Sequence, residues 1–445
     1  MSKPVQRFGW RFLRSLYANN RRALSEAFGG GDHAVVKLPL FAPIYLSRSS
    51  ELAAHLFRND DELYSRREAY GFKGLAQALE NGVLTAEGET WQKMREHLQP
   101  AFHRKQMDAY MRDIAASAAA ARRQIRGFAD SGEAFAGFEL ARRLAVEVIG
   151  KTIVGSGDLE RLDRIQLYSD NATYYAMHWT LFGRGVLGLL LWPLVLCFYY
   201  YKYRLVQECN RILDHATAGA NSFDMITTMR TARAGDGQPL FSRRDIRNQV
   251  ATMVIAGYKT TASLLTAALY ELACQPQVAQ KLREELAGRQ QHGIDSMAEL
   301  KQLPYLEAVI KEVLRLHPSV QWVMRKVKQN VNVAELALPQ DSMCFVNLGM
   351  LHRHAKYWKD PEAFVPERHL TRDDELPNSR IYFGMGKRTC LGKDLAVLEA
   401  KLLLVALVPE FGFEIVEDHD YNQGFTLLLS YQRPVIFKAR AVGAA

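Results

Sequence analysis

Apolar residues recur along most of the chain with the spacing of one face of an α-helix. Amphipathic helices are predicted wherever apolar positions repeat at intervals of three and four residues. They cover the ranges 51–57, 91–102, 104–126, 138–154, 158–182, 203–220, 243–273, 276–289, 303–316 and 391–407. One helix has Pro304 in its first turn and ends before Pro318, as the geometry of proline favours.

Alternation typical of strands is confined to a few short segments. These are 34–46, 327–338, 343–348, 413–416 and 435–438. The pattern therefore predicts a mainly α protein with small β-sheets at its edges. It contains no internal repeat, and residues 31–445 are expected to form a single domain behind a basic, amphipathic N-terminal extension, residues 1–30.

Composition and charge narrow the function classes only partly. The net charge of +9 suits nucleic acid, anionic lipid or an acidic protein, but solvated arginines explain it equally well, so we discount a nucleic-acid role. The longest apolar run, 186–201, is shorter than the ~20 residues that span a bilayer and contains Pro193. We expect it to be buried rather than to dip into a membrane, and expect a cytoplasmic protein with at most peripheral membrane contact.

The cysteines exclude several metal and redox sites. No C-x-x-C pair occurs, which argues against zinc ribbons, thioredoxin-like sites and covalently attached haem. The odd number of widely spaced thiols fits a reducing cytosol. The five residues are Cys197, Cys209, Cys274, Cys344 and Cys390.

The segment FGMGKRTCLG, residues 383–392, carries the sharpest chemical signal. It places Cys390 directly before a predicted helix, whose positive dipole end favours a thiolate. Lys387 and Arg388 are expected to add positive charge beside the sulfur. The glycines let the backbone approach a large flat group and direct N–H groups at the sulfur.

Other functions of this glycine-rich segment fit less well. A phosphate-binding loop would need glycine at Ile381 and serine or threonine at Arg388. A dinucleotide fingerprint would need a third glycine and a surrounding βαβ unit. A buried structural cysteine in a glycine turn stays open on these residues alone.

The segment resembles the haem-binding pattern of the cytochrome P-450 superfamily, F-x-x-G-x-R-x-C-x-G. The matching residues are Phe383, Gly386, Arg388, Cys390 and Gly392. The resemblance runs from about residue 34 to 438 and implies a soluble, bacterial-type haem-thiolate monooxygenase that uses O2. It implies haem b with Cys390 as the axial iron ligand, Phe383 and Gly384 near the sulfur, and Arg388 on a propionate. The implied fold is a triangular helical prism with the haem between a long central helix and the cysteine loop.

Further landmarks of the same family follow in order. Glu312 and Arg315 form its E-x-x-R pair, three residues apart on one helix face. The resemblance adds Arg368 to a structural network behind the haem.

Three more residues resemble the family's haem-binding positions. Trp91 and Arg95 match its W-x-x-x-R helix, where an indole N–H and a guanidinium can hold one propionate. Arg325 matches the arginine that binds the other propionate. Each of the three could instead be a surface or capping residue.

The stretch VIAGYKTTAS resembles the family's oxygen-binding helix, A/G-G-x-D/E-T-T/S, through Ala256, Gly257, Thr260 and Thr261. The two small residues would leave room for O2 beside the haem. The Thr260 hydroxyl can bond to the helix's own carbonyl and hold water, and the resemblance gives it proton delivery.

Lys259 departs from this pattern, because an acid is expected at that position. Three alternatives stay open. Lys259 could face away from the haem and pair with an acid, which we favour; it could relay protons after burial lowers its pKa. It could also mark an enzyme that uses peroxide or performs oxidative coupling.

The resemblance also locates the substrate and the electron donor. An apolar or aromatic small molecule of secondary metabolism is expected in a pocket lined by Tyr70, Phe72, Trp179, Val320, Trp322 and Phe425. The chain lacks fused FAD, FMN or iron–sulfur sequences, so a separate ferredoxin or similar acidic protein would bind near Lys387, Arg388 and Lys393. We expect a monomer. A haem-binding sensor without turnover is a further alternative, which the intact Thr260 disfavours.

Overall fold

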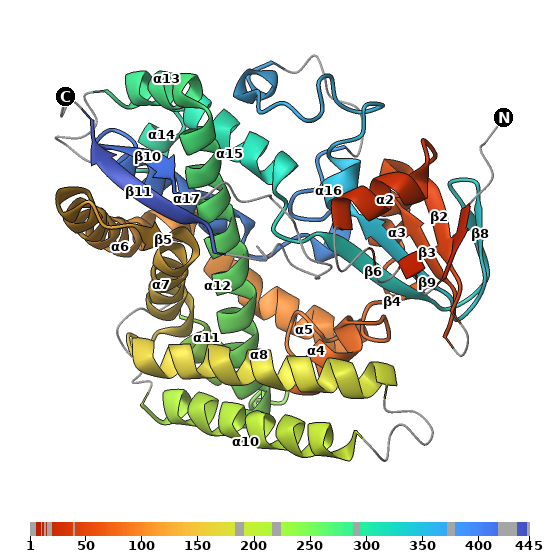
Figure 1. Ribbon diagram of the computed structural model, residues 1–445. Helices are drawn as coiled ribbons and strands as arrows, with labels where there is room; N and C mark the ends of the chain where they lie inside the picture. Colours follow the sequence, from red (N-terminus) through yellow and green to blue (C-terminus); the bar gives the residue numbers. More distant parts are fainter. Residues whose placement is uncertain are drawn as a thin grey trace.

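The structure, a computed structural model, describes residues 6–9, 11–12, 15, 20–38, 41–182, 191–215, 224–287, 294, 296–371, 379–416 and 434–442. Helices dominate it (Figure 1). The α-helices are α2 (Asn20–Phe28), α3 (Ser50–Arg58), α4 (Phe72–Leu79), α5 (Gly88–Leu98), α6 (Arg104–Ser131), α7 (Gly137–Ile149), α8 (Leu159–Phe182), α10 (Trp192–His215), α11 (Met225–Thr231), α12 (Arg243–Cys274), α13 (Pro276–Leu286), α14 (Met297–Leu300), α15 (Pro304–Leu316), α16 (Leu348–Leu351) and α17 (Lys393–Leu407). Shorter turns are η1 (Gln99–Phe102), the π-turn η2 (Gly150–Val154), η3 (Pro366–His369) and η4 (Gly386–Arg388).

Small sheets lie at one side and one end of the helical body, which confirms the predicted mainly α fold class. A six-stranded sheet has the order β1-β2-β3-β9-β6-β4, and β10-β11-β5 and β7-β8 form two smaller ones. The strands are β1 (Gln6–Phe8), β2 (His33–Val36), β3 (Ile44–Ser47), β4 (Tyr64–Ser65), β5 (Phe135–Ala136), β6 (Trp322–Val327), β7 (Val331–Val333), β8 (Leu336–Leu338), β9 (Met343–Asn347), β10 (Phe411–Ile415) and β11 (Ile436–Ala441).

Helix α12 is the central element of the helical body (Figure 1). Its 32 residues begin with a capping box, in which Ser242 and Asp245 satisfy each other's backbone N–H groups. It packs against α7, α8, α10, α15 and α17. Most faces of this helix are therefore buried, and they carry polar side chains such as Asn248, Gln249 and Glu271 as well as apolar ones.

The N-terminal residues join the six-stranded sheet, whereas the sequence pattern placed them in a separate extension. Strand β1 pairs in parallel with β2, with Gln6 opposite Ala34. Helix α2 buries Leu24 and Phe28 in the cluster beneath this sheet. Strand β1 has only three residues, which is too short for an alternation of apolar and polar positions to be recognised in the sequence. This strand could therefore not be predicted.

Helix α10 is exposed where the apolar run 186–201 was expected to be buried. Residues 186–190 lie outside the described residues, but Trp192, Leu196 and Tyr199 are each more than half exposed. Pro193 does not interrupt the helix but lies in its first turn, where the missing N–H has no cost. Among the described residues, no helix is long and apolar enough to cross a membrane.

Candidate functional site

Cys390 lies in a tight loop directly before α17. Gly384 and Gly386 have φ angles of 70° and 67°, a left-handed conformation that glycine adopts without steric penalty. Phe57 of α3 packs against them: a Cβ on Gly384 would lie 3.1 Å from Phe57 Cε1. The Cys390 N–H then donates a 2.8 Å hydrogen bond to the Phe383 carbonyl, which closes the loop. The two glycines therefore let the loop approach α3.

The surroundings of the Cys390 sulfur act on its pKa in opposite directions and on balance raise it. The residue is exposed, yet desolvation by neighbouring protein atoms raises the pKa of its thiol. A hydrogen bond from the Gly392 N–H and the charges of Arg95 and Lys393 lower that pKa. An N–H donor and two cations at the sulfur are the features that stabilise a thiolate ligand.

Arg388 and Lys387, which were predicted to add positive charge beside the sulfur, both contact Asp61, and their effect on the sulfur stays a prediction. Arg388 Nη2 donates hydrogen bonds of 2.8 Å to both Asp61 oxygens, and Lys387 Nζ lies 3.9 Å from the same carboxylate. The Arg388 guanidinium also stacks on Trp91, with Cζ 4.0 Å from the ring centroid. Arg388 is thus fixed in the core, in the fork geometry that recognises carboxylates.

Arg325 and Asp60 form a second buried ion pair beside the first. Arg325 Nε and Nη2 donate hydrogen bonds of 2.8 Å and 3.2 Å to the two Asp60 oxygens. Asp60 is 0% exposed. Burial raises the pKa of Asp60, but the charges of Arg325 and Arg66 outweigh it and hold this pKa below its ordinary value. Arg325 and Arg388, two of the three arginines that the resemblance assigned to propionates, therefore already touch aspartates.

Arg66 completes this cluster and was missed by the sequence analysis, because it belongs to none of the motifs. Its Nη2 lies 3.4 Å from Asp60 Oδ2. Three arginines now face two aspartates, and the Nε atoms of Arg66 and Arg388 are buried without a hydrogen-bond partner. Unsatisfied buried donors are unfavourable. The two propionates of a haem would supply the acceptors and the negative charge, so these residues fit that group.

Trp91 and Arg95 lie one turn apart on α5, as predicted. Arg95 Nη1 donates a 2.9 Å hydrogen bond to the Thr389 carbonyl, and Trp91 receives the Arg388 guanidinium on its ring face. Both residues therefore brace the cysteine loop. Their predicted propionate contacts stay predictions.

Glu312, Arg315 and Arg368 form the predicted structural network. Arg315 donates two 2.8 Å hydrogen bonds to the Glu312 carboxylate, and Arg368 Nε lies 3.1 Å from the same group. His369, which the sequence analysis missed, adds a 2.8 Å contact through Nε2. Burial raises the pKa of Glu312, but the Arg315 and His369 hydrogen bonds lower it to about 2.

Thr260 on α12 has the predicted local geometry. Its hydroxyl donates a 2.7 Å hydrogen bond to the Ala256 carbonyl one turn earlier, and its own carbonyl accepts one of 2.8 Å from Ser319. Gly257 instead faces α7: a Cβ there would lie 3.0 Å from Ile149 Cδ1. The small size of Gly257 thus serves helix packing, and space for O2 at this residue stays a prediction.

Lys259 turns toward α8, as the favoured alternative expected. Its Nζ lies 2.7 Å from Asp170 Oδ1, and the Tyr258 hydroxyl donates a 2.7 Å hydrogen bond to Asp170 Oδ2. Both oxygens of one carboxylate are therefore held by consecutive residues of α12. No sequence motif pointed to Asp170, because its partner lies 89 positions away.

The predicted substrate residues divide into three groups. Tyr70, Phe72, Trp179 and Val320 are half-buried and stay candidates. Trp322 is 1% exposed and packs edge-on against Phe345 in the six-stranded sheet, and its place in the substrate pocket stays a prediction. The indole of Trp322 belongs to the hydrophobic cluster beneath the six-stranded sheet. The sequence around Trp322 did not predict this packing. Phe425 lies outside the described residues.

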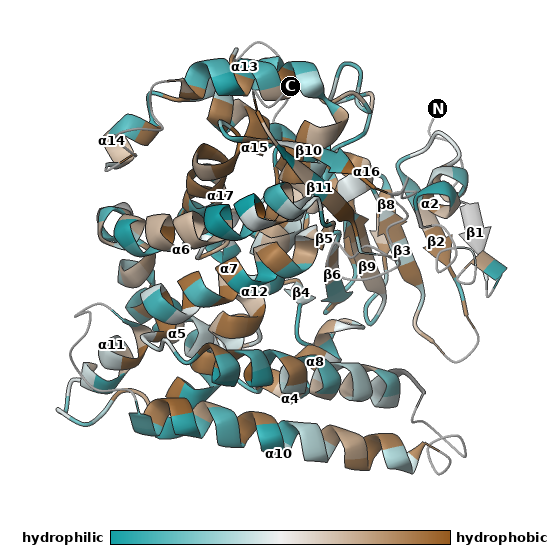
Figure 2. Cartoon of the chain, turned by 60° about the vertical axis from the view of Figure 1, so that its left-hand side comes forward, coloured by the Kyte–Doolittle hydropathy of each residue, from teal (hydrophilic) through white to brown (hydrophobic). Residues whose placement is uncertain are grey.

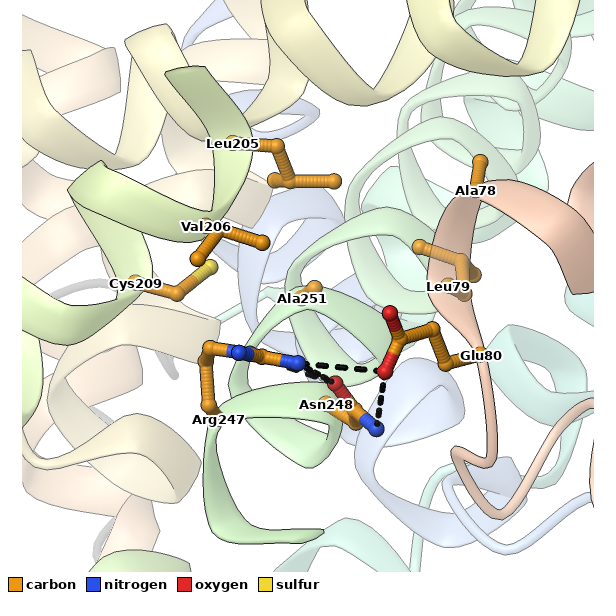
Figure 3. A pocket seen from close by; sticks show the side chains of 9 residues that line it. All are labelled: Ala78, Leu79, Glu80, Leu205, Val206, Cys209, Arg247, Asn248 and Ala251. Atoms are coloured by element: carbon orange, nitrogen blue, oxygen red, sulfur yellow. Dashed lines mark hydrogen bonds and ion pairs between the residues drawn. The ribbon is translucent and has the colours of Figure 1, made fainter. Parts of the chain in front are cut away.

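A small pocket lies where α4 ends between α10 and α12 (Figure 3). Its volume is about 10 Å³, roughly the space of one water molecule. Glu80 closes one side and receives hydrogen bonds from Arg244 and Arg247 of α12, while Lys202 of α10 lies 3.1 Å away. Burial raises the pKa of Glu80, but bonds from Arg244 and Lys202 hold it at about 2. This cluster ties α4 and α10 to α12.

Comparison with known proteins identifies the family of this chain. The family profile of cytochrome P450 matches residues 40–438. The chain is 29% identical over 373 residues to a probable cytochrome P450 4s3 of Drosophila melanogaster, covering 77% of this chain and 72% of that protein. It is 25% identical to cytochrome P450 3A29 of Sus scrofa, covering 84% and 78%, and 23% identical to a lithocholate 6-beta-hydroxylase of Mesocricetus auratus, covering 98% and 90%.

The chain therefore belongs to the cytochrome P450 family and is an oxidoreductase of the monooxygenase type. Family membership brings a haem with its iron and the use of O2. The relatives named above are animal proteins, whereas a bacterial type was expected from the resemblance; that finer assignment stays a prediction.

Proposed function

We propose that this chain inserts one oxygen atom from O2 into an apolar or aromatic small molecule of secondary metabolism, with electrons from a separate protein. The observation that carries the proposal is the exposed Cys390 thiol, which has the Gly392 N–H at its sulfur. The buried arginine cluster beside the loop supplies the matching anion site.

Each part of the site would have a separate role. Cys390 would bind the iron of haem b, and Arg66, Arg325 and Arg388 would hold the propionates. Haem supplies the oxygen chemistry once it is bound by a thiolate. Thr260 would hold a water molecule and pass a proton from its hydroxyl, which needs to turn away from the Ala256 carbonyl to do so.

The test is reduction of the purified protein under carbon monoxide. We expect the red-shifted Soret band of a thiolate-ligated haem, followed by a spin-state shift when apolar aromatic compounds are added. Isotopically labelled O2 should then place one labelled atom in the product. A protein that binds no haem, or whose product carries oxygen from water, would contradict the proposal.

The peroxide-using alternative has less support than the sequence suggested. Its only support was Lys259, and the ion pair of Lys259 with Asp170 supports a structural role for this residue instead. A non-catalytic sensor would not need the Thr260 geometry described above. Turnover with hydrogen peroxide in place of O2 and reductant, at an equal or higher rate, would revive the first alternative.

The proposed electron donor is an acidic, ferredoxin-like protein that binds near the cysteine loop. Lys387 and Lys393 are exposed there and can steer such a partner. Arg388, which was predicted to contribute to this surface, is 8% exposed and cannot. We expect reduction to slow as salt rises, and more weakly so in Lys387→Gln/Lys393→Gln. A rate that is indifferent to salt would count against this partner.

We also propose that the chain works in the cytoplasm as a monomer with peripheral contact to a lipid surface. Tyr199 and Tyr203 are 62% and 61% exposed on α10, which packs along α8 at the edge of the helical body (Figures 1 and 2). Trp192 and Leu196 extend this row. Amphipathic Trp and Tyr side chains favour the membrane interface, and the positive net charge suits anionic lipid.

Sedimentation with vesicles tests this contact. We expect the protein to sediment with vesicles that contain anionic lipid, and Tyr199→Ser/Tyr203→Ser to sediment less. The matched control is Leu167→Ser, which changes a 54% exposed residue on α8. A dimer in analytical ultracentrifugation that the double variant abolishes would instead assign the row to self-association and contradict the lipid contact.

A further inference from the structure

Asp170 connects the oxygen-site turn of α12 to α8 through two adjacent contacts. Lys259 Nζ lies 2.7 Å from Asp170 Oδ1, and the Tyr258 hydroxyl lies 2.7 Å from Oδ2. Lys259 Nζ also lies 5.6 Å from the centroid of the Tyr258 ring, so the three groups form one compact unit. The next residue, Thr260, is the one that the family uses at oxygen.

Helix α8 in turn carries a layer that we call the cover, which consists of α4 (Phe72–Leu79), α8 (Leu159–Phe182) and α10 (Trp192–His215). Helix α8 packs against both other members and against α12. Two candidate substrate residues, Phe72 and Trp179, belong to this layer. The cover is held to α12 at one place by Glu80 with its arginines, and at another by Asp170.

We propose that Lys259 is a positioning residue that latches the cover to the oxygen-site turn through Asp170. The family has an acid at this position. Lys259 would have a different role, because it would hold α8 against the turn Ala256–Thr260 while substrate is bound. This inference rests on the monooxygenase function proposed above. Because the latch depends on opposite charges, the family's own acid is the wrong residue at 259 in this chain.

The charges make an unusual prediction for the variant that restores the family pattern. Lys259→Asp would remove the cation that pairs with Asp170 and leave a second carboxylate on the same side of α12, and like charges repel. The Lys259 and Asp170 side chains are 34% and 39% exposed, so solvent screens the pair. A partly exposed ion pair shifts the equilibrium between the closed and open contact of α8 with α12 by up to about 5-fold toward the closed contact. A pair of like charges shifts the same equilibrium toward the open contact by a similar factor.

Four variants test the latch: Lys259→Asp, Asp170→Lys, the charge-swapped combination of both, and Lys259→Met. Substrate affinity is measured from the spin-state shift, and amide hydrogen exchange is followed in α8 and α12. We expect Lys259→Asp to weaken substrate binding about 5-fold and to speed exchange in α8. The swapped variant should recover to within about 2-fold of the wild type, because opposite charges face each other again.

A matched control exists elsewhere in the chain. Glu367 also receives a lysine and a tyrosine, with Lys281 Nζ at 2.6 Å and the Tyr305 hydroxyl at 3.1 Å, but it joins α13 and α15 to η3. Lys281→Asp should change neither substrate affinity nor exchange in α8. A loss of affinity in Lys281→Asp equal to that in Lys259→Asp would show a general effect of surface charge and overturn the latch.

Two further outcomes would also overturn the proposal. One is a Lys259→Asp variant with unchanged substrate affinity and unchanged hydrogen exchange in α8, but with less release of peroxide. That result would mean that the residue at position 259 takes part in proton delivery rather than in holding α8. The other is a swapped variant as impaired as the worse single variant. Hydrogen exchange needs no turnover, so failure of the carbon monoxide test would reject the proposed function while the exchange result still decides the latch.

Discussion

Replacing Glu312 by Gln tests the buried network most directly. The carboxylate accepts hydrogen bonds from Arg315, Arg368 and His369, and both Glu312 and Arg315 are 0% exposed. Glutamine has nearly the same shape but only one acceptor oxygen. Its NH2 group would face the Arg315 and His369 donors, and the arginines would lose their buried counter-charge.

The size of the effect follows from two independent estimates. Removing one partner of a buried ion pair costs about 3–5 kcal/mol. Lowering the pKa of Glu312 from 4.5 to about 2 corresponds to roughly 3 kcal/mol of stabilisation at neutral pH. We therefore expect Glu312→Gln to lower the free energy of unfolding by about 3 kcal/mol.

The stabilisation by Glu312 should also depend on pH in a defined direction. A carboxylate with a lowered folded pKa contributes its full stabilisation above the unfolded value near 4.5, and loses it as the pH falls toward about 2. The difference between wild type and Glu312→Gln should therefore shrink over that interval. Urea unfolding of the haem-loaded proteins, followed by circular dichroism at several pH values, measures it.

A loss below about 1 kcal/mol, or a difference that is the same at pH 2 and pH 7, would refute the reasoning. If Glu312→Gln yields no folded protein, the wild-type protein still gives the pH dependence. Arg368→Lys is a milder second variant, because it keeps the charge but loses the Nη1 contact of 2.6 Å to the Lys359 carbonyl.

Three further predictions concern the site and its supports. Cys390→Ala should abolish the thiolate-type carbon monoxide spectrum while circular dichroism stays unchanged; an unchanged spectrum would contradict iron ligation by this sulfur. Asp60→Asn should lower the free energy of unfolding by about 3 kcal/mol because it removes the charge of a fully buried carboxylate that pairs with Arg325, whereas Asp341→Asn, at a 69% exposed side chain, should change it little; equal losses in urea unfolding would refute this. Gly82→Ala would place a Cβ 1.8 Å from Thr252 Oγ1, so we expect this variant to have a lower melting temperature. The double variant Gly82→Ala/Thr252→Gly should recover part of the loss, because it removes the clashing side chain. If calorimetry shows no recovery, the steric cause is disproved.

The sequence predicted the long helices because they are amphipathic or end in recognisable caps. The helix expected at 243–273 is α12, Arg243–Cys274, and that at 303–316 is α15, Pro304–Leu316. The pattern missed α4 and β6, which are short and whose boundaries depend on tertiary contacts. It also began α10 at residue 203 rather than Trp192, because Pro193 was taken as a break and not as a first-turn residue.

In the site, contacts within a sequence motif were predictable, whereas contacts between residues far apart in the sequence were not. Residues tied to motifs, such as Thr260 with its Ala256 contact or Glu312 with Arg315, have the predicted geometry. Partners outside the motifs were not predictable: Asp170 and Asp60 are ordinary acids in sequence, and only folding brings them to Lys259 and Arg325. Long-range ion pairs leave no periodic pattern, because charge alone does not say which cation an acid will meet.

The parallel pairing of β1 with β2 has a practical consequence for engineering the N-terminus. β1 is the outermost strand of its sheet, and α2 buries Leu24 and Phe28 against the same cluster. A protein trimmed to begin near residue 31 would bare a row of unpaired backbone groups on β2 together with an apolar surface. Such edges recruit strands from other molecules, so trimming there favours aggregates, while fusions placed before β1 leave the sheet intact.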